Sequence, residues 1–229
     1  MKRILMILCA GMVILSASGK KPLTLFLIGD ETMCEQTSPE DRTDSSAVGW
    51  GQVLGQYLPE GTIIENHAFE GATTRSLKDD GRWTNILARA NRGTMLFIQL
   101  GQKDYDESDG RTYSSLEDFE NHLMAMIEEA QKKHLKVVLL TPVAKRHFKE
   151  GVLHPRHGAY AEGVRRVATR LKLPLIDVDA MTYTWLESLG EEKAKLYFAG
   201  EDEVRLNENG AKIVAEKVVE AAREKKVIK

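Results

Sequence analysis

A carboxylate stands where an apolar segment runs into a loop near the start of the chain. Residues 25–36 read LFLIGDETMCEQ, so the apolar run stops at Gly29 and Asp30, and the next side chain is that of Glu31. A strand that ends in this way delivers a side chain to the rim of a sheet, where a carboxylate can act as an acid, a base or a nucleophile. Glu31 is therefore the first candidate for chemistry.

Further ionisable side chains gather in the segments that follow other apolar runs, and in one segment before the last helical pattern. Ligands of a parallel sheet bind at the carboxyl ends of the strands, where the loops diverge. We therefore expect these segments to form a cleft with Glu31, and the polar loops 106–111 and 146–156 to shape it. The segments are NHAFEGATTRS (66–76), GQKDYDE (101–107), TPVAKRHF (141–148), DVDAMTY (177–183) and YFAGEDEVRLNENGA (197–211).

Apolar runs of strand length alternate with helical patterns along the whole chain. Runs such as MLFIQL and VVLL have few polar interruptions, which is typical of strands buried on both faces. The alternation predicts a parallel sheet covered by helices on both faces, with right-handed crossovers. The expected strands are 23–28, 62–65, 95–100, 137–140 and 175–178, and the expected helices are 48–58, 80–90, 115–134, 157–171, 181–189 and 207–225.

The first nineteen residues have the pattern of a secretory signal peptide. Lys2 and Arg3 precede an apolar stretch over residues 4–15, and small residues follow at 16–19. The apolar part is too short for a comfortable membrane span. We therefore expect a secreted or periplasmic protein without a membrane anchor after cleavage, whose single domain comprises residues 20–229.

The composition of residues 20–229 excludes several classes of protein. Loss of Lys2 and Arg3 takes the formal charge from −2 to −4, and a mildly acidic chain without basic runs gives no reason to expect nucleic acid as a partner. Only Cys34 remains, so no internal disulfide is expected. We expect neither a metal nor a cofactor, because the histidines lack a recognised ligand spacing.

Six blocks, taken in order, resemble the SGNH hydrolases, and within them the rhamnogalacturonan acetylesterase-like carbohydrate esterases. The first block is similar to that family's Gly-Asp-Ser-Thr opening, and the last to its closing Asp-x-Thr-His. The resemblance implies a three-layer α/β/α sandwich with a parallel, flavodoxin-like sheet of five strands. The blocks are IGDETM (28–33), VGWGQVL (48–54), NHAFEGATTRSL (66–77), LFIQLGQKD (96–104), LLTPVAKRHF (139–148) and DEVRLNENGA (202–211).

The chain departs from this family where the chemistry is done. In the family a serine attacks an acetyl carbonyl, a histidine takes its proton, and an aspartate orients the histidine. A glycine amide and an asparagine side chain help to hold the oxyanion. The resemblance places Glu31 at the serine position, Lys103 at the asparagine position and Arg205 at the histidine position, whereas Gly71 and Asp202 match the family.

These replacements predict a pseudoenzyme with an ion-pair network in place of the triad. Arg205 stays protonated and cannot accept a proton, and Lys103 is a flexible point charge in place of a fixed amide. The formal charges of Glu31, Lys103, Asp202 and Arg205 sum to zero. We expect Arg205 to bridge Glu31 and Asp202, because a buried charge without a partner is costly.

The resulting hypothesis is a protein that has lost serine-esterase activity and keeps a carbohydrate-binding or scaffolding role. A pectin-type glycan is the expected ligand of the cleft. The residues expected to contact it are those that match the family around the altered centre: Thr32, Gly71, Arg75, Lys103 and Arg146.

Other interpretations stay open at this point. The chain could be an active carbohydrate acetylesterase on pectin-type glycans with non-standard residues, its base being His67, His147, His154 or His157. It could also cleave glycans with Glu31 and Asp202, if these lie about 7–8 Å apart as the carboxylates of inverting glycosidases do. Finally, the charged residues could merely fill a pocket that does nothing.

Overall fold

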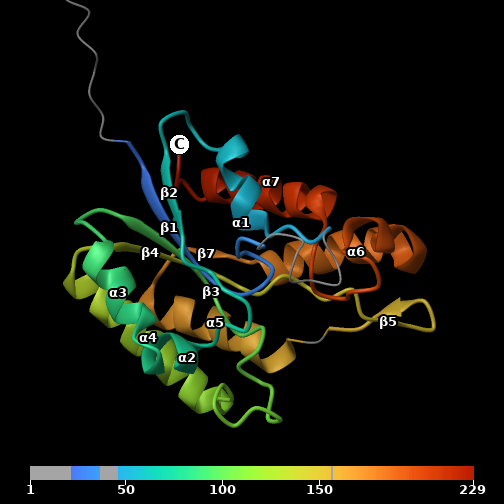
Figure 1. The fold of residues 1–229 in the computed structure, drawn as a ribbon, viewed down its shortest axis with the longest axis horizontal. Helices are drawn as coiled ribbons and strands as arrows, with labels where there is room; N and C mark the ends of the chain where they lie inside the picture. The colour runs from blue at the N-terminus through green and yellow to red at the C-terminus, as the bar shows by residue number, and fades with distance from the viewer. Residues whose placement is uncertain (1–21, 37–45, 156) are drawn as a thin grey trace, which may run out of the picture.

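The computed structural model describes residues 22–36, 46–155 and 157–229, so the predicted signal peptide lies outside the described residues. Its centre is a five-stranded parallel sheet with the order β2-β1-β3-β4-β7 (Figure 1). This arrangement confirms the predicted flavodoxin-like sheet. The strands are β1 (Thr24–Ile28), β2 (Ile63–Asn66), β3 (Met95–Gln99), β4 (Lys136–Leu140) and β7 (Leu175–Ile176).

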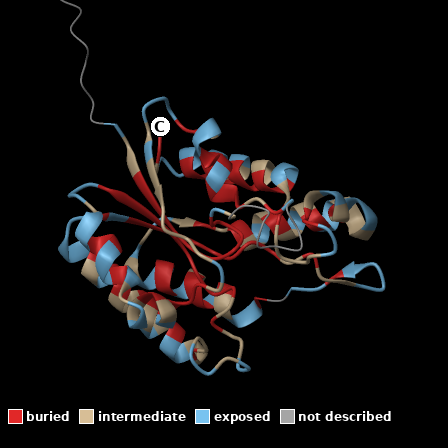
Figure 2. Ribbon diagram, in the orientation of Figure 1, coloured by how far each residue is buried: buried red, intermediate tan, exposed pale blue. Residues whose placement is uncertain are grey.

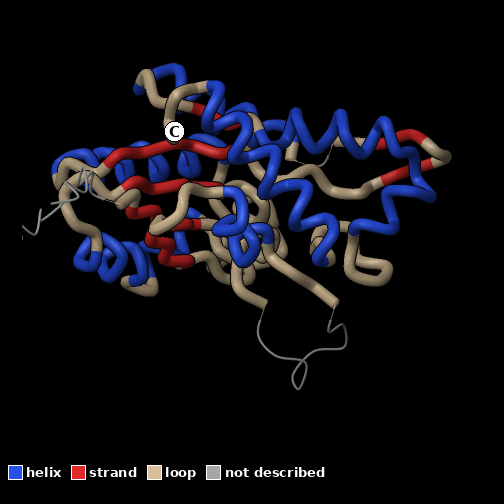
Figure 3. Tube along the Cα trace, turned by 90° about the horizontal axis from the view of Figure 1, so that it is seen from above, coloured by secondary structure: helices blue, strands red, loops and turns tan. Residues whose placement is uncertain are grey.

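Helices cover both faces of the sheet and form the two outer layers (Figures 1 and 3). Alternate side chains of β1 point to opposite faces of the sheet. Leu25 and Leu27 pack under one set of helices, and Phe26 and Ile28 pack under the other. The first set comprises α1 (Trp50–Val53), the 3₁₀ helix η2 (Leu54–Tyr57), α6 (Val178–Ala194) and α7 (Glu208–Glu224). The second comprises α2 (Thr74–Asp79), α3 (Arg82–Arg89), α4 (Leu116–Lys132) and α5 (Gly158–Leu171).

The buried residues concentrate in the sheet and on the helix faces turned toward it (Figure 2). Trp50 and Trp83 are buried in opposite layers. This distribution explains the continuous apolar runs in the sequence, because a parallel sheet covered on both faces has no polar side. Across the described ranges, no helix combines the length and the apolar character needed to cross a membrane.

Several elements differ from the sequence-based expectation. The helix expected at 181–189 is longer, because the Asp177 side chain accepts a hydrogen bond from the Ala180 amide and starts α6 at Val178. Strand β7 therefore ends at Ile176, before the predicted end at residue 178. Helix α2 and an antiparallel hairpin of β5 (Phe148–Lys149) and β6 (Val152–Leu153) were not expected; the hairpin extends from the body beside α6 (Figure 1).

The loop before α7 is anchored tightly to that helix. The Asn207 side chain caps α7 by accepting from the Gly210 amide at 3.1 Å, and its Nδ2 donates to the carbonyls of Leu196 and Phe198. Gly210 lies so close to the 3₁₀ helix η3 (Lys195–Tyr197) that a Cβ there would be 2.1 Å from the Tyr197 carbonyl oxygen. This close approach sets where the loop carrying Asp202 and Arg205 can lie.

A buried polar cluster supports the turn after β1. Asp30 is fully buried, and its Oδ1 accepts from the Thr32 amide at 2.9 Å and from Thr32 Oγ1 at 2.7 Å. Gln99 Nε2 donates to Thr32 Oγ1 at 2.7 Å and lies 3.3 Å from both Asp30 oxygens, while Gln99 Oε1 accepts from Trp50 Nε1. Burial and the adjacent Glu31 charge raise the pKa of Asp30 to about 7.

A second buried carboxylate supports the turn after β3. Asp104 accepts from the Thr74 amide at 2.8 Å, from Thr74 Oγ1 at 2.6 Å and from the Gly101 amide at 3.0 Å. It therefore ties the turn that carries Lys103 to the start of α2. Burial raises the pKa of Asp104 to about 6.

We expect Gly210→Ala to lower the free energy of unfolding by about 2 kcal/mol or more, because the methyl group forces the Tyr197 carbonyl away. The matched control is Gly55→Ala, where the nearest atom to the new Cβ is Ile64 Cδ1 at 3.5 Å. That change should alter stability by less than about 1 kcal/mol. Urea unfolding curves of the two variants measure the difference, and equal midpoints would contradict the close approach.

The raised pKa of Asp30 predicts a stability that falls as the pH rises from about 4 to 7. In that interval the folded protein holds a proton that the unfolded chain has released, so raising the pH favours unfolding. Asp104 acts in the same direction up to about pH 6. We expect Asp30→Asn to flatten the dependence above pH 6, because an amide does not titrate.

Urea unfolding at a series of pH values tests this prediction. The control is Glu117→Gln, which removes an exposed carboxylate and should leave the slope unchanged. A slope between pH 6 and 7 that survives Asp30→Asn would show that another group is responsible.

Candidate functional site

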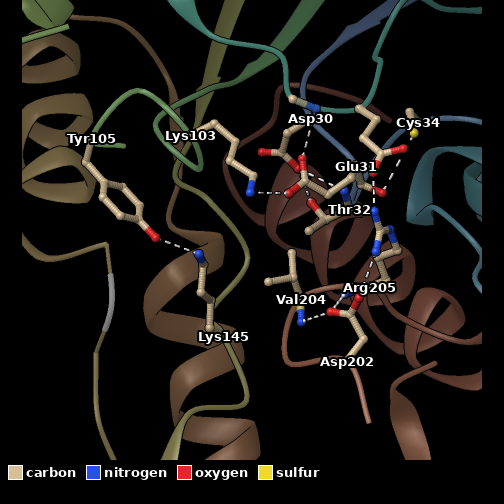
Figure 4. A network of polar contacts seen from close by, with 12 residues as sticks. Asp30, Glu31, Thr32, Cys34, Lys103, Tyr105, Lys145, Asp202, Val204 and Arg205 are labelled. Atoms are coloured by element: carbon tan, nitrogen blue, oxygen red, sulfur yellow. Dashed lines mark hydrogen bonds and ion pairs between the residues drawn. The ribbon is translucent and has the colours of Figure 1, made fainter. Parts of the chain in front are cut away.

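Glu31 is buried at the centre of the site, with 4% of its surface exposed. Its Oε2 accepts a hydrogen bond from the Gly71 amide at 3.3 Å, and Lys103 Nζ lies 4.0 Å from its Oε1. Figure 4 shows the Lys103 side chain extended toward these carboxylate oxygens. Three residues that the sequence predicted to share a cleft, from three different segments, therefore meet at one carboxylate.

The backbone around Gly71 explains why its amide faces Glu31. The Phe69 amide donates to the Gly29 carbonyl at 3.0 Å, which ties the turn after β2 to the end of β1. The Ala72 amide closes the turn by donating to the Phe69 carbonyl. Gly71 itself has a φ of 72°, a backbone conformation that residues with a Cβ atom rarely adopt. A glycine is thus required for the turn that aims this donor.

Arg205 lies on the opposite side of the site and binds two carboxylates. One terminal nitrogen donates to Asp202 Oδ2 at 2.9 Å and the other to Glu70 Oε1. Asp202 Oδ1 accepts from the amides of Val204 and Arg205 at 2.6 and 2.9 Å, so a short turn presents this carboxylate (Figure 4). Burial opposes the charge of Arg205, yet the hydrogen bonds to Glu70 and Asp202 raise its pKa above the ordinary value.

The expected bridge from Glu31 through Arg205 to Asp202 is therefore wrong in one partner. Glu31 turns toward the Gly71 amide and Lys103, and Glu70 takes the second place on Arg205. The physical reason is that Glu70 precedes Gly71 in the same turn and brings a carboxylate to the rim that the family pattern did not indicate. Two separate ion-pair clusters result instead of one closed network.

An open cavity of about 360 Å³ lies between the two clusters. More acidic than basic side chains line it, in contrast to the zero sum of the four residues considered from sequence. Loop 106–111, which was expected to shape the cleft, supplies two of the additional acids. The acidic lining residues are Glu31, Glu70, Asp106, Asp109 and Asp202, and the basic ones are Lys103 and Arg205.

Three of the residues that were predicted to contact a glycan do not line the Glu31 cavity, as far as the described residues show. Thr32 is buried and its hydroxyl belongs to the Asp30 cluster. Arg75 lines a second cavity of about 560 Å³ that adjoins the first. Arg146 is 6% exposed, and its guanidinium donates to the carbonyls of Glu201 and Asp202. Arg146 thus braces the turn that presents Asp202.

The histidines considered as alternative bases do not line the Glu31 cavity, whose lining is known for the described residues. His157 is buried, its Nε2 lies 2.9 Å from the Val143 carbonyl, and burial lowers its pKa to about 3. His67 packs against Phe26, and burial lowers its pKa as well. His147 pairs with Glu203 and its ring lies against that of His154.

Tyr105 lies beside the site rather than in it. Its hydroxyl accepts from Lys145 Nζ at 2.7 Å (Figure 4). Tyr197, the last residue of η3, packs edge-on against Trp185 with ring centroids 5.0 Å apart. Neither ring lines the Glu31 cavity among the described residues.

The arrangement limits the chemistry available. A serine-type mechanism needs a hydroxyl nucleophile, a neutral base and free oxyanion donors. At the positions that the resemblance assigns to the nucleophile and the base, this chain has Glu31 and Arg205, and the Gly71 amide already donates to the Glu31 carboxylate. What remains is a polar cavity with charged walls.

Comparison with known proteins supports the fold and the family. Residues 27–213 match the model of the GDSL-like lipase/acylhydrolase family. The chain is 32% identical over 219 residues to the rhamnogalacturonan acetylesterase RhgT of Bacillus subtilis, covering 90% of this chain and 91% of that protein. It is 29% identical over 175 residues to the probable rhamnogalacturonan acetylesterase YesY of the same organism, covering 76% of this chain and 78% of that protein.

Solved structures show the same fold at lower identity. The crystal structure of the B. subtilis protein YxiM matches with a TM-score of 0.79 and 24% identity, covering 90% of this chain and 58% of that chain. The acetylxylan esterase Axe2 of Geobacillus stearothermophilus matches with a TM-score of 0.66 and 21% identity, covering 87% of this chain and 93% of that chain.

Three observations point to the same family. They are the order of the strands in the sheet, the meeting of Glu31, Gly71 and Asp202 at one cavity, and the match of residues 27–213 to the family model. This chain belongs to the GDSL-like lipase/acylhydrolase family and is similar to rhamnogalacturonan acetylesterases.

Proposed function

We propose that this protein is an exported, carbohydrate-binding member of the family that has lost serine-esterase activity. The observation that carries the proposal is the hydrogen bond from the Gly71 amide to the Glu31 carboxylate. In an acetylesterase of this family, that amide would hold the oxyanion formed from the acetyl carbonyl. Here the side chain at the nucleophile position supplies an anion of its own to the same donor.

The Glu31 carboxylate thus resembles an acetate ion that is covalently attached to the site. A substrate acyl group would have to displace this carboxylate from the Gly71 amide and from the neighbourhood of Lys103. Displacement would leave a buried charge without its partners, which is costly. The anion therefore opposes acyl binding as well as replacing the nucleophile.

Proton transfer is blocked on the other side of the cavity. The raised pKa of Arg205 keeps its guanidinium charged, so it cannot take a proton from a nucleophile or from water. Glycan cleavage by Glu31 and Asp202 is also disfavoured, because both oxygens of Asp202 already accept hydrogen bonds from within the chain. A general acid has to present a proton to the leaving group.

The cavity remains suited to binding a carbohydrate. Carboxylates accept hydrogen bonds from sugar hydroxyls, and five of them line the cavity. The adjoining cavity of about 560 Å³ shares Glu70, Gly71, Asp109 and Thr112 with the first, so an elongated ligand can extend from one to the other. The names of the relatives favour an acetylated, pectin-type glycan. The signal pattern of residues 1–19 would bring the protein to such a polymer.

We expect the wild-type protein to show no hydrolysis of 4-nitrophenyl acetate or acetylated rhamnogalacturonan above that of Glu31→Ala. The triple variant Glu31→Ser, Lys103→Asn, Arg205→His should gain activity on the order of 10³-fold, since it restores nucleophile, oxyanion donor and base around the retained Gly71 and Asp202. Initial rates of acetate release measure both.

The control for the gain is the same triple variant with alanine in place of serine at position 31. Wild-type turnover that Glu31→Ala abolishes would overturn the loss of activity. A folded triple variant no faster than its alanine control would overturn the assignment of these positions.

Binding is tested separately from hydrolysis. Thr112 lines both cavities, so Thr112→Trp should obstruct them and weaken binding of acetylated rhamnogalacturonan fragments by about tenfold or more. Isothermal titration calorimetry measures the affinity. The matched control is Thr169→Trp on the exposed face of α5, which should bind as the wild type does. Absence of wild-type binding to the fragments would refute the carbohydrate-binding role.

A further inference from the structure

A separate pocket lies between the end of β2 and helix α3, outside the Glu31 cavity. Its volume is about 290 Å³, and residues 66–68 form one wall. Arg82, Asn85 and Arg89 form the other wall. These three positions are spaced three and four residues apart, so they lie along one face of α3. The pocket is thus framed by a strand end and a row of hydrogen-bond donors.

The wall formed by residues 66–68 offers few hydrogen-bond acceptors to the donors on α3. Asn66 is committed to the fold, since its Nδ2 donates to the Met33 carbonyl at 3.0 Å and its Oδ1 accepts from the Ala68 amide at 3.1 Å. The His67 ring packs against Phe26 in a tilted arrangement, with ring centroids 4.9 Å apart. Among the described residues, no carboxylate belongs to the lining of this pocket. A ligand that fits must therefore bring the acceptors itself.

Arg82 is held in place through its guanidinium plane. The guanidinium lies 4.2 Å from the centroid of the Phe69 ring, a cation–π contact that orients it. Its Nε is 3.9 Å from Asp80 Oδ2, beyond hydrogen-bond distance. Both terminal nitrogens of Arg82 are without an acceptor among the described residues, and 53% of the side chain is exposed.

Arg89 is oriented by a single hydrogen bond from its Nε atom. Its Nε donates to Glu65 Oε2 at 2.8 Å, and the same carboxylate oxygen lies 3.3 Å from His67 Nε2. Glu65, which is not among the lining residues, thus orients the arginine and partly offsets its charge. The terminal nitrogens of Arg89 also have no acceptor among the described residues. Two preoriented guanidinium groups therefore present paired N–H donors along one pocket wall.

We propose that this pocket is a second ligand site, which binds an oxyanion such as the carboxylate of an acidic sugar or a phosphate. Arginine forks match the two oxygens of such groups and form two parallel hydrogen bonds with them. The amide of Asn85, whose side chain is exposed on the same helix face, adds a donor for a neighbouring hydroxyl. The buried Ile86 forms an apolar floor.

The electrostatic contrast with the Glu31 cavity makes the two sites selective for different groups. Five acids line that cavity, so an anionic group is repelled there and attracted to the two arginines. Phe69, on which Arg82 stacks, lines the cavity that adjoins the Glu31 cavity. One carbohydrate could then place neutral sugars at Glu31 and an acidic unit at Arg82 and Arg89.

The test is an NMR titration of the folded protein with D-galacturonate, inorganic phosphate and D-galactose at constant ionic strength. Galacturonate or phosphate should shift the backbone amide signals of residues 66–68 and 82–89, whereas neutral galactose should not. The double variant Arg82→Gln, Arg89→Gln should weaken anion binding by about tenfold or more, since each arginine supplies charge-assisted hydrogen bonds. Stronger binding of galacturonate identifies a sugar as the source of the oxyanion, and stronger binding of phosphate identifies a free ion.

The control variant Arg166→Gln, Arg170→Gln removes the same charge from α5 and should change the affinity less than roughly twofold, as expected of a distant charge at moderate salt. Thermal melts of both double variants, which lose the contacts of Arg89 with Glu65 and of Arg166 with Glu120, check that each stays folded during the titration. The proposal is overturned if neither anion shifts these signals, if the Arg82/Arg89 variant binds as the wild type does, or if the shifts centre on Glu31 and Gly71.

Discussion

The burial of Asp30 at the end of β1 is the constraint on which the site depends. A fully buried carboxyl group needs hydrogen-bond partners, and Asp30 finds them in Thr32 and Gln99. Those bonds hold the turn that follows the strand, and Trp50 links the same cluster to α1 through Gln99. The turn can therefore keep its shape whichever side chain occupies position 31. This independence is consistent with a glutamate at the position that the resemblance assigns to a serine.

The same burial sets the conditions for a charge at position 31. Two adjacent carboxylates repel each other, and this repulsion together with burial raises the pKa of Asp30 to about 7. Glu31, in contrast, has the Gly71 amide and Lys103 beside it. The Gly71 amide, which an esterase would keep for a transient oxyanion, here donates to the Glu31 carboxylate. Lys103 in place of an asparagine fits this interpretation, because a cation compensates a carboxylate better than an amide does.

The fold and one half of the site followed from the sequence, whereas the second ion-pair partner of Arg205 did not. The strand of residues 95–99 was predictable because burial on both faces leaves an unbroken apolar run. Helix α2 was not, because six residues starting from the Thr73 cap are too few for a periodic pattern. The meeting of Glu31, Gly71 and Lys103 was predictable, since each follows a strand of one parallel sheet. The pairing of Arg205 with Glu70 was not, because it depends on the path of a turn.

The separation of the charges into two clusters bears on whether the cavity has a binding role or is only a remnant of a former active site. Arg205 has enough donors for two carboxylates, and these are the carboxylates of Asp202 and Glu70. With Glu70 as its second partner, the clusters stay on opposite walls and the space between them remains open. A pocket filled only for stability would gain from apolar packing and would avoid lining a cavity with five acids, whose mutual repulsion is unfavourable. An open, acidic cavity at the usual ligand edge of the sheet therefore supports the proposed binding role over a pocket filled only for stability.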